Sequence, residues 1–237
     1  NWSRIVCQIV YYFYSYFKLQ KDNLSFSVPT GNFGDIFAGY VAKKMGLPID
    51  KLIVATNEND ILQRVINSGE YKPHTVKPSI TPSMDIQVAS NFERLLFYIL
   101  DENDQKVSML MNDLSLKGSF NLDKEVVKKI KKDFEAVRIN DEETQKIIKN
   151  IYEKHQFILD PHTATGIGAA NKVKGLKNVV VLGTAHPYKF NDTIKKVTGK
   201  SLEAPKHLKM YIDKKEEFDI IGNSNLEVKN YILSKIL

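Results

Sequence analysis

Short apolar segments rich in β-branched residues alternate with helical patterns, and this alternation limits the fold more than any other feature. Residues 24–28 (LSFSV) and 51–57 (KLIVATN) are predicted strands, and the helical pattern between them, residues 35–45, stops at Gly46 with Pro48 behind it. A strand, a helix and a strand in this order form a βαβ unit with parallel strands.

The same alternation continues downstream. Further strands are predicted at residues 135–140, 157–160 and 178–183, and helices at residues 5–17, 60–68 (capped by Asn59), 91–100, 123–134 and 141–155. Residues 71–84, dotted with prolines, have no periodicity and indicate a long loop. We therefore expect an α/β fold with one open, mostly parallel sheet and helices on both faces. No repeat, linker or internal boundary divides residues 1–237.

Composition and charge exclude few classes of protein. With 237 residues and 43% hydrophobic residues the chain can fill a proper core. The net charge of +6 comes largely from lysine-rich helical runs such as residues 124–132, where lysines alternate with apolar residues as on a solvated helix face. No recognition motif accompanies them, so we expect no nucleic-acid partner.

The apolar run at residues 5–17 (IVCQIVYYFYSYF) is too short for a membrane span and contains Gln8 and Ser15, so a buried helix is expected. Cys7, the only cysteine, should be buried in it, and one cysteine suits a reducing compartment, the cytoplasm. Because Asn1 stands directly at the start of this helix, we expect that sequence precedes it.

Ligands of open parallel sheets bind at the carboxyl ends of the strands, which directs attention to three junctions: PTGNFGD, DPHTATG and LGTAHP. In the first, Gly31 and Gly34 allow a close approach of the backbone, and the amides of residues 32–34 can face an anion at the N-terminus of the next helix. The spacing fits neither the P-loop nor the dinucleotide fingerprint. A structural turn with Asp35 near the helix start and a phosphate site both remain open.

The other two junctions carry hydroxyl and imidazole groups. Thr184 follows the most apolar strand, where its hydroxyl either projects into the crevice or ties down the turn before Pro187. His162 and His186 have no partner at metal-ligand spacing, so we expect capping or turn roles and no metal site. With no Gly-x-Ser-x-Gly elbow and Cys7 inside a helix, no nucleophile for hydrolysis is evident.

Taken together, the junctions match a family. The motifs NWSRI, SVPTGNFGDIFAGYVAKKMGLPI, ATNENDIL, TPSMDIQVASNFERL, DPHTATGIGAA and LGTAHPYKF stand in the order found in threonine synthase, and they cover nearly the whole chain. The sequence closely resembles the C-terminal portion of this pyridoxal-phosphate lyase, which has the fold of the tryptophan-synthase-β type (fold type II).

The resemblance implies roles for particular residues. The cofactor phosphate would meet the backbone amides of Gly31, Asn32, Phe33 and Gly34, with Asp35 beside them, and Thr184 would meet the pyridine nitrogen. The implied reaction converts O-phosphohomoserine and water to threonine and phosphate. Asn1 and Arg4 are candidates for binding the substrate phosphate. Arg4 can equally extend its guanidinium from a buried helix into solvent, without a ligand.

One departure from the family pattern limits these implications. The Schiff-base lysine lies, in the family, in an N-terminal segment that has no counterpart here, and none of the lysines of this sequence stands in the matching motif. The chain alone is therefore expected to be inactive. A threonine-synthase-like phospho-lyase and a non-catalytic remnant or binding module remain as alternatives, and the oligomeric state is left open.

Overall fold

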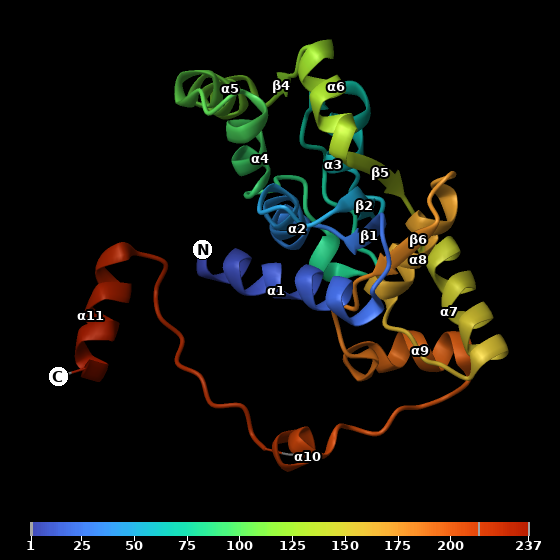
Figure 1. Ribbon diagram of the computed structural model, residues 1–237. Helices are drawn as coiled ribbons and strands as arrows, with labels where there is room; N and C mark the ends of the chain where they lie inside the picture. The colour runs from blue at the N-terminus through green and yellow to red at the C-terminus, as the bar shows by residue number, and fades with distance from the viewer. Residues whose placement is uncertain (1, 213, 237) are drawn as a thin grey trace. The chain divides into compact units, whose positions relative to one another are not determined.

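A four-stranded parallel sheet with the order β5-β2-β1-β6 lies at the centre of the computed structural model (Figure 1). The structure describes residues 2–212 and 214–236. The strands are β1 (Leu24–Pro29), β2 (Ile49–Thr56), β5 (Phe134–Arg138) and β6 (Asn178–Val181). The predicted open parallel sheet is confirmed.

Side chains alternate between the two faces of the sheet, as the period of two in a strand requires. On one face, Phe26 of β1, Leu52 and Val54 of β2 and Phe134 of β5 belong to the largest buried apolar cluster. On the other face, Ile53 and its neighbours form a smaller cluster with Ala169 of a covering helix. Both faces of the central strands β1 and β2 are buried, which explains why these two strands are mostly apolar.

Helices cover the two faces in separate groups. The larger cluster is covered by α1 (Trp2–Leu19), α2 (Gly34–Lys44), α3 (Ile61–Ser68), α4 (Phe92–Ile99) and α6 (Lys124–Asp133). The opposite face is covered by α8 (Pro161–Lys172), against which α7 (Asp141–His155) packs, and α9 (Asn191–Thr198) packs against α7. Helices on both faces were predicted and are confirmed.

Two short strands form an antiparallel pair separate from the parallel sheet. It consists of β3 (Glu70–Tyr71) and β4 (Phe120–Asn121), whose rings Tyr71 and Phe120 stack with centroids 4.6 Å apart. The remaining elements here are η1 (Pro82–Met84), α5 (Asp104–Lys117) and η2 (Pro187–Phe190). The elements β3, β4 and α5 were not predicted from the sequence.

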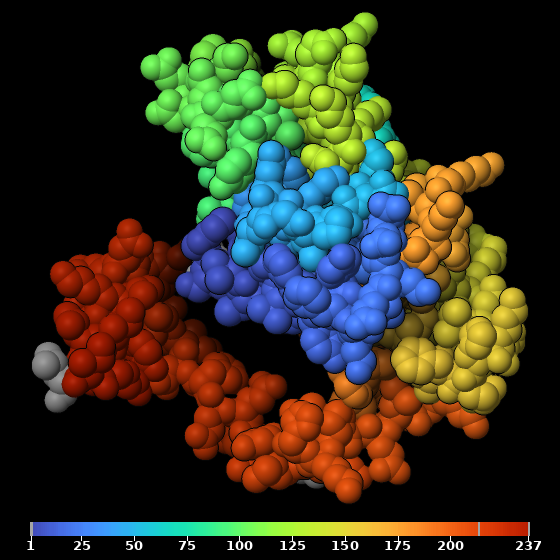
Figure 2. Space-filling model, in the orientation of Figure 1, coloured from blue at the N-terminus to red at the C-terminus, as the bar shows by residue number. Residues whose placement is uncertain are grey.

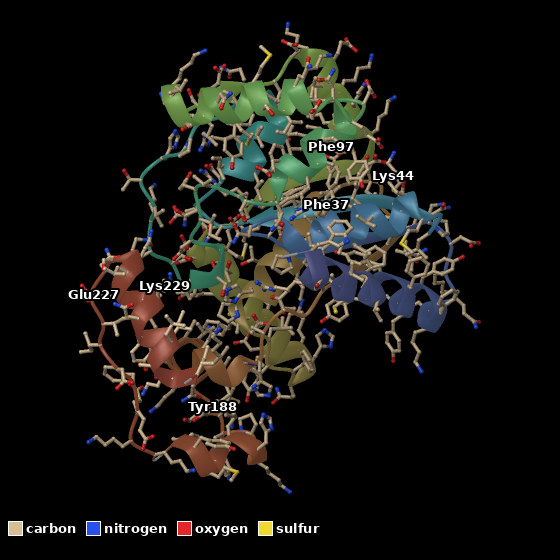
Figure 3. All side chains as sticks on the ribbon, turned by 90° about the vertical axis from the view of Figure 1, so that its left-hand side faces the viewer. Phe37, Lys44, Phe97, Tyr188, Glu227 and Lys229 are labelled. Carbon is tan, nitrogen blue, oxygen red and sulfur yellow. The ribbon has the colours of Figure 1, made fainter. Side chains whose placement is uncertain are left out.

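The chain divides into two compact units, Asn1–Leu202 and Glu203–Leu237. The second contains α10 (Lys206–Ile212) and α11 (Asn225–Ile236), and neither helix has a buried residue. Figure 3 shows Glu227 and Lys229 projecting from α11. That residues 1–237 belong to one functional region without an internal boundary remains a prediction.

Three local predictions were wrong. Residues 157–160 form no strand: the apolar side chains Ile158 and Leu159 pack among α7, α8 and α9 without pairing to the sheet. The helix over residues 5–17 is not a buried helix, because only Ile5 and Tyr12 of α1 are buried, and Cys7 is therefore exposed. Asn59 does not cap α3, whose N-cap is Asp60.

Helix α1 lies directly against α2, and the two form a continuous surface in Figure 2. The contact depends on Gly39, because a Cβ there would lie 2.5 Å from Cε1 of Tyr12 and 2.9 Å from Cδ2 of Leu52. Tyr12 is fully buried, and its ring also packs on Phe26 with centroids 4.8 Å apart. A glycine in the middle of α2 thus sets how closely α1 approaches the sheet.

Replacing Gly39 with alanine should destabilise the protein by about 2 kcal/mol, because neither the ring of Tyr12 nor the side chain of Leu52 has room to retreat. Urea unfolding measures the change. Gly183→Ala is the control, since a Cβ there would meet only the Thr163 hydroxyl, at 3.9 Å, and should change the free energy of unfolding by less than about 0.5 kcal/mol. If the Gly39 variant is as stable as the wild type, α1 can move away from α2 to make room for the new Cβ, and the predicted contact is not a fixed one.

Candidate active site

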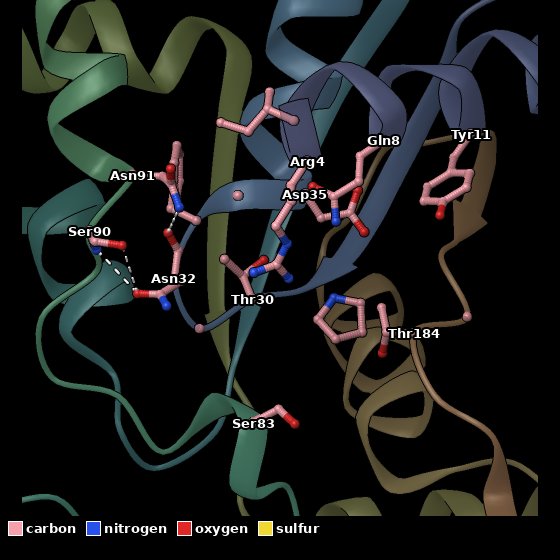
Figure 4. A pocket seen from close by; sticks show the side chains of 16 residues that line it. Arg4, Gln8, Tyr11, Thr30, Asn32, Asp35, Ser83, Ser90, Asn91 and Thr184 are labelled. Carbon is pink, nitrogen blue, oxygen red and sulfur yellow. Dashed lines mark hydrogen bonds between the residues drawn. The ribbon is translucent and has the colours of Figure 1, made fainter. Parts of the chain in front are cut away.

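A cavity of about 450 Å³ opens at the carboxyl ends of β1 and β6 (Figure 4). The loop after β1 supplies residues 29–35, and Gly183 and Thr184 follow β6. The remaining side chains come from α1 and from the segment before α4, and they are Arg4, Ile5, Gln8, Tyr11, Ser83, Ser90 and Asn91. Two of the three predicted junctions therefore line one cavity.

Parallel pairing explains why these junctions meet. Ser27 of β1 stands opposite Val181 of β6, and the next amide, that of Leu182, donates to the carbonyl oxygen of Ser27 at 3.0 Å. On the other side of β1, the amide of Thr30 donates to the carbonyl oxygen of Ala55 at 2.8 Å. Because the three strands end at the same edge, the residues that follow them leave the sheet side by side.

The backbone at the start of α2 has an unusual conformation. Phe33, the N-cap, lies in the left-handed region with φ 64°, which is strained for a residue with a side chain. Burial of its ring against Phe92 and Phe134, at 5.3 and 5.7 Å between centroids, holds it there. The first N–H groups of α2 have no partner within the helix and carry its positive dipole end. This loop can bind an anion.

Hydrogen bonds fix the orientation of Asn32 in this loop. Its side-chain oxygen accepts from the amide and the hydroxyl of Ser90, both at 3.2 Å, and its main-chain oxygen accepts from the amide and the side chain of Asn91, at 3.2 and 3.0 Å (dashed in Figure 4). Both oxygens of Asn32 are therefore engaged. The polar groups of Asn32 that remain for a ligand are N–H donors.

The carboxyl group of Asp35 stands in the first turn of α2 and lines the cavity. Burial raises the pKa of this group to about 6, and the hydroxyl of Tyr12, which donates to Oδ1 at 3.2 Å, opposes part of the rise. The same hydroxyl donates to the main-chain oxygen of Asp35 at 2.8 Å. Burial and the neighbouring Asp35 raise the pKa of Tyr12 well above its usual value, so this hydroxyl keeps its proton.

The remaining predicted residues have different outcomes. Thr184 is exposed on the wall opposite the α2 loop, and Arg4 and Gln8 project from α1 into the cavity in Figure 4. Asn1 lies outside the described residues. Several lining residues were not predicted from the sequence, among them Gln8, Tyr11, Ser83, Ser90 and Asn91. The last three belong to the motif TPSMDIQVASNFERL, to which no role was assigned.

The third junction, DPHTATG, stabilises the fold instead of lining the cavity. Asp160 caps α8 by accepting from the amides of His162 and Thr163, at 2.9 and 3.3 Å, and from the Thr163 hydroxyl. His162 is buried against the ring of Phe190, at 4.9 Å between centroids. His186 caps η2, since its Nδ1 accepts from the amide of Tyr188 at 3.2 Å, as the predicted turn role requires.

Among residues 2–212 and 214–236, no group of three or more histidine, cysteine or acidic residues is placed to hold a metal ion. No helix within the same ranges combines the length and apolarity of a bilayer span.

Known proteins are similar to this chain in both sequence and structure. A family sequence model described as "Threonine synthase, C-terminal" matches residues 163–232. The threonine synthase of Pseudomonas aeruginosa is 42% identical over 98% of this chain and 50% of its own length. A crystal structure of the pyridoxal-phosphate-bound threonine synthase of Brucella melitensis superposes with a TM-score of 0.91 at 44% identity, over 98% of this chain and 51% of that one.

In sequence and in fold, the chain belongs to the threonine synthase family. It spans about half the length of the curated relatives it matches. The threonine synthase of yeast gives the same result in a solved structure, with a TM-score of 0.87 and 40% identity over 100% of this chain and 52% of that one. The family and the fold type expected from the motifs are thus confirmed.

The raised pKa of Asp35 predicts how stability depends on pH. The folded protein holds this proton up to a pH of about 6, whereas the unfolded chain releases it near 3.8, so stability falls as the pH rises between these values. Asp35→Asn removes the effect, and its free energy of unfolding relative to the wild type should increase by about 2 kcal/mol from pH 4 to pH 7.

Urea unfolding of both proteins across this pH range measures the difference. Asp50→Asn, at an exposed position of β2, serves as the control and should follow the wild type at every pH. A constant difference between the Asp35 variant and the wild type would show that Asp35 does not hold the proton.

Proposed function

We propose that this chain forms the part of a threonine synthase that binds the cofactor phosphate and pyridine ring, for a reaction that converts O-phosphohomoserine and water to threonine and phosphate. The observation that carries the proposal is one cavity with two facing walls. The donor-rich N-terminus of α2 forms one wall and the hydroxyl of Thr184 the other.

The residues present fit pyridoxal phosphate. The amides of Gly31, Asn32, Phe33 and Gly34 would hold its phosphate, and the hydroxyl of Thr184 would contact the pyridine nitrogen without requiring that nitrogen to be protonated. Gly31 has no space for a side chain, because a Cβ would lie 2.7 Å from the carbonyl oxygen of Ser83. When bound, the cofactor supplies an electron sink for proton removal from the substrate.

Two ionisable side chains, Arg4 and Asp35, would shape substrate binding in the same cavity. Arg4 has the planar guanidinium suited to the phosphate of O-phosphohomoserine, with Asn1 as a second candidate. Asp35 stands beside the anion seat, the backbone amides of residues 31–34, and below a pH of about 6 its protonated carboxyl group would avoid repulsion between two anions. This pairing supports a small phosphorylated amino acid as the substrate.

Among the described residues no lysine lines the cavity. The Schiff-base lysine of the reaction is therefore assigned to sequence outside this chain, and this chain alone is expected to show no turnover. The single cysteine favours a reducing compartment, and we assign the reaction to the cytoplasm as part of the same proposal.

Sequencing the coding region next to residue 1 and assaying the complete protein test the proposal. Threonine and phosphate formed in equal amounts from O-phosphohomoserine are the expected products. A keto acid in place of threonine would establish a phospho-lyase instead. An adjoining region without a lysine motif, together with no turnover, would leave a non-catalytic binding module.

Replacement of Gly31 by alanine should weaken pyridoxal phosphate binding by about tenfold or more, because the new Cβ forces either the α2 loop or the segment at Ser83 to move. Quenching of the fluorescence of Trp2, the single tryptophan, measures binding to this chain. Pyridoxal, which lacks the phosphate, is the control ligand and should be affected much less. An unchanged affinity for pyridoxal phosphate would remove the α2 loop from the site.

Replacement of Thr184 by alanine should have a different effect. The hydroxyl adjusts the electronic properties of the ring more than it anchors the cofactor, so the affinity for pyridoxal phosphate should fall by less than about tenfold. Turnover by the complete protein should fall much further. Binding titrations and initial rates measure the two quantities, and a fully active variant would exclude Thr184 from the site.

A further inference from the structure

The segment from residue 72 to residue 91 forms one wall of the cavity, although it has almost no regular structure of its own. It connects β3 to α4 and contains only the short helix η1. Ser83, Ser90 and Asn91 of this segment line the cavity. A long irregular segment needs fixed points if it is to hold such side chains in place.

The carboxylate of Asp85 is one such fixed point. Its Oδ1 accepts from the side-chain amides of Asn57 and Asn59, at 2.7 and 2.9 Å, and from the hydroxyl of Ser79, at 2.6 Å. Its Oδ2 accepts from the main-chain amide of Ser79 at 2.9 Å. Four donors therefore converge on one carboxylate, an arrangement that needs acceptors on both oxygens.

The two asparagines belong to the sheet end of this network. Asn57 and Asn59 follow directly after β2, and both are buried. Asn59 also exchanges two hydrogen bonds with the main chain of Lys77, at 2.8 and 2.9 Å. From the start of α7, Asp141 accepts from the amide of Ile80 at 3.2 Å. The segment is thus tied to the carboxyl end of β2 and to a helix on the opposite face.

The network acts on the anion seat through Ser83, two residues before Asp85. The carbonyl oxygen of Ser83 would lie 2.7 Å from a Cβ on Gly31, so the segment and the α2 loop are in contact at the backbone. Farther along, Ser90 and Asn91 hold Asn32. The position of residues 79–91 therefore determines the width of the seat and the direction of its donors.

We infer that Asp85 is a positioning residue for the cofactor phosphate: with Asn57, Asn59 and Ser79 it holds residues 79–91 against Gly31 and Asn32. The inference rests on the proposed function of the cavity. It gives a role to the motifs ATNENDIL and TPSMDIQVASNFERL, which supply Asn57, Asn59 and Asp85 and which the proposed cofactor contacts leave unexplained.

Asp85→Asn is the main test, because it keeps the shape of the side chain but places an NH₂ group among four donors. We expect the affinity for pyridoxal phosphate, measured by Trp2 fluorescence, to fall about tenfold. We also expect amide hydrogen exchange to accelerate about tenfold over residues 79–91 and to remain unchanged in β1 and β2. If Asp85 only stabilised the fold, Asp85→Asn would accelerate amide exchange throughout the protein or leave the affinity for pyridoxal phosphate unchanged.

Two further variants keep the test decisive. Ser79→Ala removes one hydroxyl, should act in the same direction by about threefold, and replaces Asp85→Asn as the test if that variant does not fold. Asp101→Asn is the control, since the Asp101 side chain is 81% exposed in a turn and should behave as the wild type.

The outcomes separate the inference from the proposed function. Exchange over residues 79–91 at the wild-type rate in Asp85→Asn, or faster exchange with unchanged pyridoxal phosphate affinity, would overturn the positioning role. Wild-type protein that binds no pyridoxal phosphate would instead overturn the proposed function, and the exchange rates would still decide whether Asp85 holds the segment.

Discussion

Parallel pairing of β1 with β2 on one side and β6 on the other is the constraint on which the rest of this structure depends. It brings three strand ends to one edge of the sheet, although the strands are far apart in the sequence. The α2 loop leaves from β1, Thr184 follows β6, and Asn57 follows β2. The anion-binding loop before α2, Thr184 on the opposite wall and the asparagine that holds Asp85 therefore all originate at the same edge of the sheet.

Buried contacts convert this arrangement into a defined site. Phe33 has a strained backbone that only its buried ring sustains, and Gly39 lets α1 approach until the Tyr12 hydroxyl reaches Asp35. The same contact places Arg4 and Gln8, one to two turns earlier on α1, in the cavity. The cavity combines a positive helix end, a cation and a carboxyl group of raised pKa, which suits binding of more than one anionic group.

Local pattern predicted much of the fold and part of the site, and the failures have physical reasons. The strands β1, β2, β5 and β6 were recognisable because strands buried on both faces are apolar runs. Residues 157–160 have the same character, but Ile158 and Leu159 pack among helices instead of pairing with the sheet, a difference that no local pattern records. Cys7 was misplaced because α1 carries large apolar side chains such as Val10 and Phe17 on its exposed side as well, so apolar character alone did not mark the buried side.

The motifs and their order in the sequence were sufficient to identify the family. They also predicted the parallel sheet and the residues at the ends of β1 and β6, because each motif consists of residues that are neighbours in the chain. Only the tertiary structure showed that Ser90 and Asn91 orient Asn32 and that Asp85 gathers donors from Asn57 and Asn59 after β2. These pairs are separated by 26 to 59 residues in the chain. Folding brings them together, because a buried polar group must find its partner wherever the packing of the sheet places one.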